Sequence, residues 1–243
     1  MRNRGKKLKY KKAILKISGE FLGTKGKLFD RNSITYITEQ IVKVHQAGVR
    51  LGIVVGAGNI IRGRETDWMP RIDADISGMM ATIINGIVLY SQLQLKKVPV
   101  RLCSSMEVKG VVNRFNKFED KEFFDAGTVP LFVGGTGNPL FTTDSAAAVR
   151  AVELGADILI KGTKVEGVYS SDPQKNPRAV FYSSLTFDQA IRENLQVMDL
   201  TAFNICRENK IRICVYNFMK YSLKDIFVGM YIGSLLKPGG KHD

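Results

Sequence analysis

The stretch that decides the fold reads Leu131-Phe132-Val133-Gly134-Gly135-Thr136-Gly137-Asn138-Pro139-Leu140-Phe141-Thr142-Thr143-Asp144-Ser145. It begins as an apolar β-type run, passes through a glycine-rich turn, and ends where Thr143 or Asp144 can cap a helix. A strand that leads through glycines to a helix N-terminus presents backbone N–H groups that can bind an anion. An ordinary βα connection has the same composition, so the stretch predicts an α/β fold, and an anion site needs support from other loops.

Two further predicted strands end in loops of this kind. Residues 11–18 form a predicted strand that carries Lys16 near its end. Residues 50–55 form a near-continuous apolar strand that opens into the glycine loop 56–59, with Arg62 close behind. Lysine and arginine at such places are groups that bind phosphate. Because the carboxyl ends of parallel strands lie at one edge of a sheet, we expect these loops to converge there.

Strands and helices alternate along the rest of the chain. Further strands are predicted at residues 98–102, 129–133, 156–161 and 211–215, with an edge strand at 230–236. Helices are predicted up to about residue 46 after a cap at Asn32 or Ser33, and at 73–95, 115–125, 144–154, 187–192 after Thr186, and from Asp199 to about 209. Residues 162–173 predict a hairpin-like excursion. The fold class is therefore α/β, three-layered and doubly wound, with a mostly parallel central sheet and helices on both faces.

Composition and charge exclude several classes of protein. With 243 residues, 44% of them apolar and 24% charged, the chain has ample core and fits one large α/β domain or two small lobes. No apolar run approaches the roughly 18 residues of a membrane helix, and no secretory signal is recognisable. The three cysteines lack metal-ligand spacing and predict reduced thiols in a cytoplasmic protein. Neither a GxGxxG fingerprint nor a GxxxxGK[ST] P-loop is present, which argues against dehydrogenases and P-loop NTPases.

The formal net charge of +13 is concentrated near the start of the chain, where seven of the first twelve residues are Lys or Arg. Residues 1–9 predict a flexible basic tail, and residues 237–243 predict a disordered tail. Because no aromatic-interleaved basic stripe accompanies the charge, a solvated tail is favoured over nucleic-acid binding. A nucleic-acid-binding regulator stays open as the alternative from a different class.

Four motifs together resemble the amino acid kinase fold family and, within it, the bacterial uridylate (UMP) kinases. They are Lys16-Ile17-Ser18-Gly19, Gly56-Ala57-Gly58-Asn59 with Arg62, the run from Gly135 to Ser145, and Lys164-Val165-Glu166-Gly167-Val168-Tyr169 with Asp172-Pro173. Val197-Met198-Asp199-Leu200 adds to them. The resemblance covers about residues 10–236 and implies one domain there. Its N-terminal part would bind the acceptor UMP, and the part from about residue 155 onward would bind ATP.

The resemblance also implies an activity and partners. The γ-phosphoryl group of ATP, accompanied by Mg²⁺, would be transferred to UMP to give UDP and ADP in pyrimidine nucleotide biosynthesis. The enzyme would be a cytoplasmic homohexamer that GTP activates and UTP inhibits. A kinase of the same fold that acts on a carboxylate or carbamate stays open, and it would need a cationic or amide pocket in place of residues 136–143.

Carried over position by position, the resemblance implies four catalytic residues, which are Lys16, Arg62, Asp144 and Asp199. It implies ATP contacts at Lys16, Ile17, Ser18, Gly19, Gly58, Arg62, Thr163, Tyr169 and Asp172. It implies UMP contacts at Ala57, Asp75, Thr136, Gly137, Asn138, Pro139, Leu140, Phe141, Thr142 and Thr143. Lys16 would bridge the phosphates, while Asp144 and Asp199 would orient it and the metal. Mg²⁺ would be held through the ATP phosphates, with no direct protein ligand.

Two positions depart from the family pattern. Ala57 stands where glycine is usual, and its methyl group is costly only if φ is positive there. We expect a β-region backbone at Ala57. Glu166 replaces the more common aspartate, and we expect a tolerated surface change.

Overall fold

The computed structural model describes residues 7–63, 66–230 and 232–239. Its central sheet has eight strands in the order β3-β4-β2-β1-β5-β9-β10-β8. They are β1 (Lys12–Ile17), β2 (Arg50–Val55), β3 (Val100–Ser104), β4 (Val129–Val133), β5 (Ile158–Thr163), β8 (Ser184–Thr186), β9 (Arg212–Asn217) and β10 (Ser234–Lys237). Neighbouring strands are parallel except β9 and β10. The predicted mostly parallel sheet is therefore confirmed.

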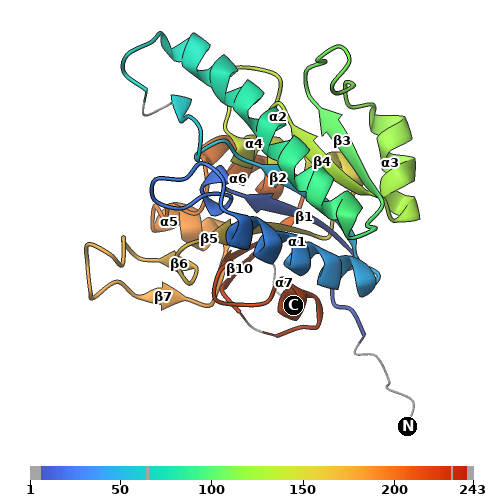
Figure 1. Cartoon of the computed structure of the whole chain (residues 1–243). Coiled ribbons are helices and arrows are strands. Elements are labelled where there is room, and N and C mark those ends of the chain that lie inside the picture. The colour runs from blue at the N-terminus through green and yellow to red at the C-terminus, as the bar shows by residue number, and fades with distance from the viewer. Residues whose placement is uncertain (1–6, 64–65, 231, 240–243) are drawn as a thin grey trace.

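Helices cover both faces of this sheet, as predicted (Figure 1). One face carries α1 (Arg31–Gln46), α2 (Arg71–Leu95) and α7 (Leu223–Phe227), and the other carries α3 (Lys117–Ala126), α4 (Thr143–Leu154), α5 (Phe187–Arg192) and α6 (Leu200–Glu208). A 3-10 turn, η1 (Gly19–Phe21), follows β1. The excursion predicted at residues 162–173 extends further along the chain, as a two-stranded ribbon of β6 (Val168–Tyr169) and β7 (Phe181–Tyr182), which projects at the lower left of Figure 1.

Two hydrophobic cores lie on the two faces of the sheet, and the period of two along each strand divides the side chains between them. In β1, Leu15 and Ile17 enter the core beneath α1, α2 and α7, while Ile14 enters the core beneath α4. In β5, Ile160 and Leu159 divide in the same way. The alternation directs the next polar position of each strand, Lys16 and Lys161, toward the α4 side.

The element boundaries correct several details of the sequence prediction. Asp30, rather than Asn32 or Ser33, caps α1 by accepting from Ser33 N at 3.0 Å. Helix α4 begins one residue earlier than predicted, because the Thr142 hydroxyl accepts from Asp144 N at 3.0 Å. The caps predicted at Thr186 and Asp199 are confirmed.

The C-terminal strand also differs from its prediction. It is Ser234–Lys237 and lies between β9 and β8, so it is not an edge strand, because the unpredicted β8 takes that place. Lys237 belongs to β10, so the predicted tail cannot start there. Residues 1–6 of the predicted basic tail and residues 240–243 of the predicted C-terminal tail lie outside the described residues. Lys9, the last residue of the predicted basic tail, donates its backbone N–H to Phe227 O at 2.8 Å.

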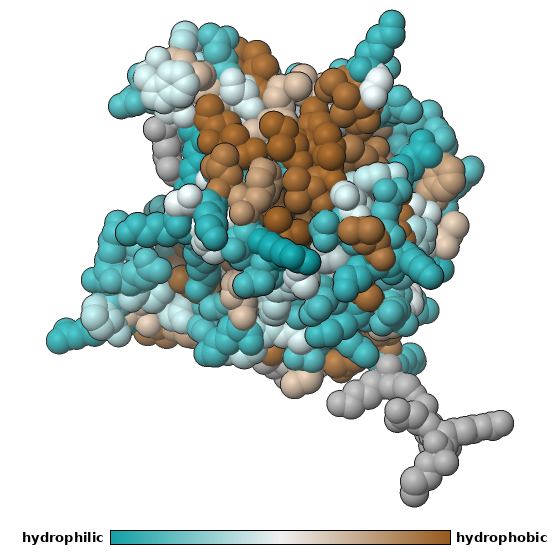
Figure 2. Space-filling view, viewed as in Figure 1, coloured by the Kyte–Doolittle hydropathy of each residue, from teal (hydrophilic) through white to brown (hydrophobic). Residues whose placement is uncertain are grey.

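Helix α2 has two different faces. By length and composition it could cross a membrane, a property that sequence inspection missed, but Ile83, Leu89 and Leu93 are buried in the core as in a soluble domain. Its outer face carries an exposed apolar stripe, which Figure 2 shows as a brown patch over the upper half of the view. The stripe consists of Ile72, Ile76, Met80, Ile84 and Ile87. Their spacing of three or four residues puts them on one side of the helix.

Candidate functional site

The order of the strands creates a crevice at the carboxyl end of β1. β1 pairs with β2 on one side and with β5 on the other. The chain reaches β2 directly after α1, but it reaches β5 only after it has completed β3 and β4. Ligands of open α/β sheets bind at such a switch point, outside the carboxyl ends of the strands. Lys16 lies there, one residue before the end of β1.

A pocket of about 370 Å³ lies at this point, and we call it the central pocket. It brings together ten of the residues singled out from the sequence, which are Lys16, Ser18, Ala57, Gly58, Arg62, Asp75, Asn138, Phe141, Thr142 and Thr143. Thr136 instead lines an adjoining pocket of about 330 Å³, which shares Asn138 and Phe141 with the first. The loops after β1, β2 and β4 therefore converge on one cavity, as their glycines predicted.

The centre of charge is Asp144, in the first turn of α4. Its carboxylate is buried, and its Oδ1 lies 2.7 Å from Lys16 Nζ, while its Oδ2 lies 2.8 Å from Lys161 Nζ. Burial alone would raise the pKa of Asp144, but the two ammonium groups more than offset it and hold that pKa well below its ordinary value. Asp144 is therefore an anion at any physiological pH and fixes both lysines.

Asp199 holds the start of α4. Its carboxylate accepts hydrogen bonds from the Thr142 hydroxyl, from Ser145 Oγ at 2.9 Å and from Ala202 N at 2.9 Å. The last of these caps α6. Asp199 thus joins the N-termini of α4 and α6, and it acts on the Lys16–Asp144 pair through α4.

Helix α2 holds two of the loops with buried polar side chains. Asn85 is fully buried, and its Nδ2 donates to Gly56 O and to Asn59 Oδ1, both at 2.7 Å. Asn59 donates back to Asn85 Oδ1 at 3.1 Å. One turn earlier, the Thr82 hydroxyl accepts from Gly134 N at 2.7 Å. The loop after β2 and the loop after β4 are therefore both tied to one helix.

Glycine is required where these loops touch. A Cβ atom on Gly19 would lie 2.4 Å from Asn59 Oδ1 and 2.6 Å from Gly56 O, so no side chain fits between the loops after β1 and β2. In the loop after β4, Gly134, Gly135 and Gly137 have φ of 74°, 57° and 83°. Only glycine adopts this left-handed region at little cost, which explains the glycine-rich turn.

The carboxylate of Asp75 fixes the tip of the glycine-rich turn after β4. Its Oδ2 accepts from Leu140 N at 2.9 Å and from Arg71 Nε at 2.9 Å. Leu140 has a φ of 72°, which is strained for a residue with a branched side chain. Such strain persists where surrounding contacts over-determine the backbone, and it is common at binding sites.

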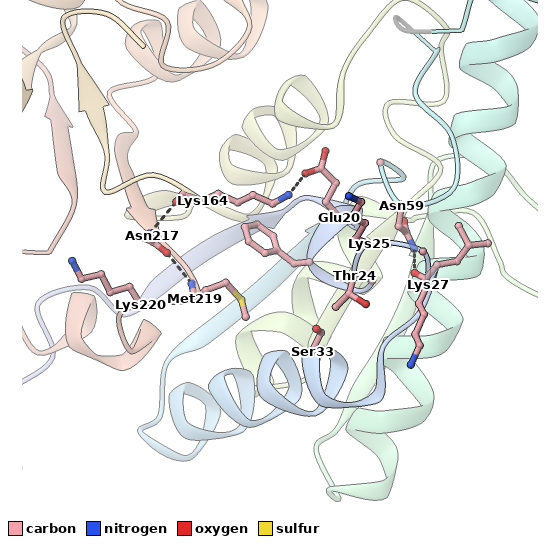
Figure 3. A pocket seen from close by; sticks show the side chains of 15 residues that line it. Glu20, Thr24, Lys25, Lys27, Ser33, Asn59, Lys164, Asn217, Met219 and Lys220 are labelled. Atoms are coloured by element: carbon pink, nitrogen blue, oxygen red, sulfur yellow. Dashed lines mark hydrogen bonds and ion pairs between the residues drawn. The ribbon is translucent and has the colours of Figure 1, made fainter. Parts of the chain in front are cut away.

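Glu20 separates the central pocket from a larger cavity. Its carboxylate pairs with Arg62 and, at 2.6 Å, with Lys164 Nζ. The larger cavity, of about 1100 Å³, is bordered by Lys25, Lys27 and Lys220 as well, and we call it the basic pocket (Figure 3). Although it is larger, the convergence of strand ends and glycine loops assigns the chemistry to the central pocket.

Three predicted ATP contacts lie outside both cavities. The Thr163 hydroxyl donates to Val165 O at 2.7 Å, and Tyr169 packs against Phe181 with ring centroids 5.3 Å apart. Asp172 accepts from Gln174 N at 2.9 Å and so stabilises a turn. Among the other predicted contacts, Ile17, Gly19, Gly137, Pro139 and Leu140 are adjacent in sequence to residues that line the central pocket.

The two departures from the family pattern have clear surroundings. Ala57 lines the central pocket and is not among the residues with positive φ, so its methyl group carries no backbone strain. The Glu166 carboxylate pairs with Lys220 Nζ at 3.0 Å on the surface.

Sequence inspection missed Lys161, Glu20, Thr82 and Asn85. Lys161 carried a detectable signal, because it is a charged residue in the apolar strand Ile158–Thr163. Asn85 lies within an apolar helix, where an amide needs a specific partner. Across the described residues, no group of three or more His, Cys, Asp or Glu side chains forms a potential metal site.

Comparisons with known proteins agree with this geometry. Residues 11–217 match the amino acid kinase family. The uridylate kinase of Methylococcus capsulatus is 43% identical, covering 95% of this chain and 98% of the relative. The structure of UMP kinase from Bacillus anthracis has a TM-score of 0.91 at 31% identity, with 95% and 97% of the two chains covered. That from Ureaplasma parvum has a TM-score of 0.87 at 37% identity, with 93% and 98% covered. The chain therefore belongs to the amino acid kinase family, in the group that includes these uridylate kinases.

Proposed function

We propose that this chain is a UMP kinase, which transfers the γ-phosphoryl group of ATP to UMP and forms UDP and ADP for pyrimidine nucleotide biosynthesis. The observation that carries the proposal is the central pocket, in which Lys16, Arg62 and Asp75 meet the glycine loops of three parallel strands. The whole-length similarity to proteins named uridylate kinase supports UMP as the acceptor.

The proposed mechanism needs positioning and positive potential rather than a base. An oxygen of the UMP phosphate is already ionised at neutral pH, so it attacks without losing a proton to the protein. Lys16 and Arg62 would neutralise charge on the transferring group, and backbone N–H groups near Gly58 would orient it. Asp75 would accept from ribose hydroxyls, and residues 136–143 would enclose the uridine. Asp144 and Asp199 would organise these groups.

The donor would bind as its Mg²⁺ complex. ATP would reach the pocket through Ser18, Gly19 and the segment from Thr163 to Asp172, so that the part of the domain after about residue 155 serves the donor. As the family resemblance implies, Mg²⁺ would be held by the phosphate oxygens of ATP, the hard oxygen ligands that this ion prefers. When bound, the ion supplies further neutralisation of phosphate charge.

The test is a coupled assay of ADP release with UMP, CMP, aspartate, glutamate and carbamate. We expect turnover with UMP, and turnover with an amino acid or carbamate instead would overturn the proposal. Lys16→Ala should lower kcat by a factor of roughly 10²–10³, the usual effect of removing a group that stabilises the transition state. Near-normal kcat in a folded Lys16→Ala variant would refute the role of Lys16.

We further propose that the enzyme is a cytoplasmic homohexamer that GTP activates and UTP inhibits, as the family resemblance implies. The apolar stripe on α2 supports self-association, since a second copy of the chain would cover it. Light scattering after chromatography should show a smaller assembly for Ile84→Glu and an unchanged one for Phe118→Glu, whose exposed side chain lies on α3. Rates measured with added GTP and UTP test the effectors.

A further inference from the structure

We propose that Lys161 is a positioning residue for phosphoryl transfer, which holds Asp144 so that the charge of Lys16 stays directed at the central pocket. The inference deepens the proposed function, because it rests on the role assigned there to Lys16. It gives a task to a partly buried lysine that substrate contacts do not require.

The two lysines face one another across adjacent parallel strands. Lys16 of β1 pairs in register with Lys161 of β5, and the alternation of both strands directs their side chains toward α4. Neighbouring strands lie roughly 4.8 Å apart, so two ammonium groups placed side by side would repel each other. Asp144, from the first turn of α4, lies between them with one oxygen on each.

The two contacts with Asp144 are not equivalent. Lys161 Nζ donates to Asp144 Oδ2 at 2.8 Å and to Val197 O at 2.9 Å, so two acceptors from different segments fix it. Lys16 Nζ forms an ion pair with Asp144 Oδ1 at 2.7 Å. Lys16 lines the central pocket, whereas Lys161 does not.

Counting charges explains why the second lysine matters. Asp144 and Lys16 alone would form a neutral pair, and both carboxylate oxygens would be available to hold the Lys16 ammonium. With Lys161 present, the cluster of Lys16, Asp144 and Lys161 carries a net charge of +1, and one carboxylate oxygen is already engaged. Positive potential therefore remains for an anionic group in the pocket, and it acts more strongly than in bulk water because the three charged side chains are largely buried.

The experiment compares Lys161→Met with Lys161→Arg and with Lys43→Met, a control at an exposed lysine on α1. We expect Lys161→Met to lower kcat about 10- to 100-fold while KM for UMP changes less than about threefold, because Lys161 acts on charge rather than on substrate binding. The kcat of Lys161→Arg should be at least tenfold higher than that of Lys161→Met, and the kcat of Lys43→Met should match that of the wild type. A kcat for Lys161→Met within about twofold of wild type, or no recovery with arginine, would overturn the inference.

A double-mutant cycle tests the route through Asp144. If Lys161 acts through that carboxylate, Asp144→Asn and Asp144→Asn/Lys161→Met should have nearly the same kcat. Fully additive losses would contradict the route. Should Lys161→Met fail to fold, Lys161→Gln keeps a donor but lacks the charge and should show the same kcat loss. Lys16→Ala separates failure of the proposed function from failure of this inference. Normal activity of Lys16→Ala would refute the assignment of the site itself. An inactive Lys16→Ala together with a normal Lys161→Met would refute only the role of Lys161.

Discussion

Replacing Asn85 with alanine should destabilise the protein by an amount that follows from its hydrogen bonds. The variant leaves the carbonyl of buried Gly56 without its donor and removes both side-chain bonds with Asn59. A buried unsatisfied carbonyl costs about 1–3 kcal/mol, and each of the two bonds to half-buried Asn59, which water can partly replace, contributes about 0.5–1 kcal/mol. The better helix propensity of alanine offsets about 0.5 kcal/mol. We expect a net loss of about 2–4 kcal/mol.

Urea unfolding and thermal unfolding measure this loss. For a chain of this length the expected shift in Tm is roughly 2–4 °C per kcal/mol, hence a decrease of about 5–15 °C. The wild type and Asn85→Ala must be compared at one protein concentration, because assembly also contributes to apparent stability. The matched control is Asn32→Ala, at an exposed position on α1, which should change the free energy of unfolding by less than about 0.5 kcal/mol.

The same substitution should also impair catalysis while the protein is folded. The loop after β2 carries Ala57, Gly58 and Arg62 to the central pocket, and Asn85 fixes its first carbonyl. A displacement of about 1 Å can cost up to a hundredfold, so we expect kcat/KM for UMP to fall at least tenfold at 20 °C. A variant that loses less than about 1 kcal/mol of stability and keeps normal kcat/KM would refute the reasoning.

Three further predictions concern titration, thiols and the acceptor. The pKa of Asp144 in the folded protein lies below its ordinary value of 3.8, so the stability that this carboxylate contributes is complete above pH 3.8 and is lost as the pH falls below it. Urea unfolding between pH 3 and 6 should show this loss in the wild type and less of it in Asp144→Asn. Burial raises the pKa of Cys206 and Cys214 to about 12 and that of Cys103 further, so Ellman's reagent at pH 8 should label the three thiols only after unfolding, and rapid labelling of the native protein would contradict this. Asp75→Asn should raise KM for UMP about 10- to 100-fold, the effect of weakening a hydrogen bond to a charged group, and an unchanged KM in steady-state kinetics would count against its ribose contact.

The fold was predictable because its signals are local. Apolar strand runs, helix periodicity and cap residues such as Thr186 and Asp199 lie within a few residues of what they specify. The same local patterns placed glycine loops after three strands, so the convergence around Lys16 and Arg62 followed from parallel topology. Capping by Asp30 rather than Asn32 was missed, because several polar residues in succession can each serve as a cap.

The unpredicted parts depend on contacts between distant segments. Strand β8 has three residues, and within the described part of the chain it pairs with β10 alone, about fifty residues later, so its sequence carries no pattern of its own. Likewise, the partner of Lys161 is a carboxylate on another element, and the partner of Asn85 is a backbone carbonyl 29 positions away. Such polar pairs become visible only once the sheet register is known.

The two polar anchors of α2 fix a distance as well as two contacts. Thr82 and Asn85 are three positions apart, which corresponds to about 4.5 Å of rise along a helix axis. Thr82 binds the loop after β4 at Gly134, and Asn85 binds the loop after β2 at Gly56. A shift of the whole helix therefore moves both loops together and keeps their separation. Slow tilting of α2 would thus reposition one wall of the cavity as a unit without widening the gap within that wall.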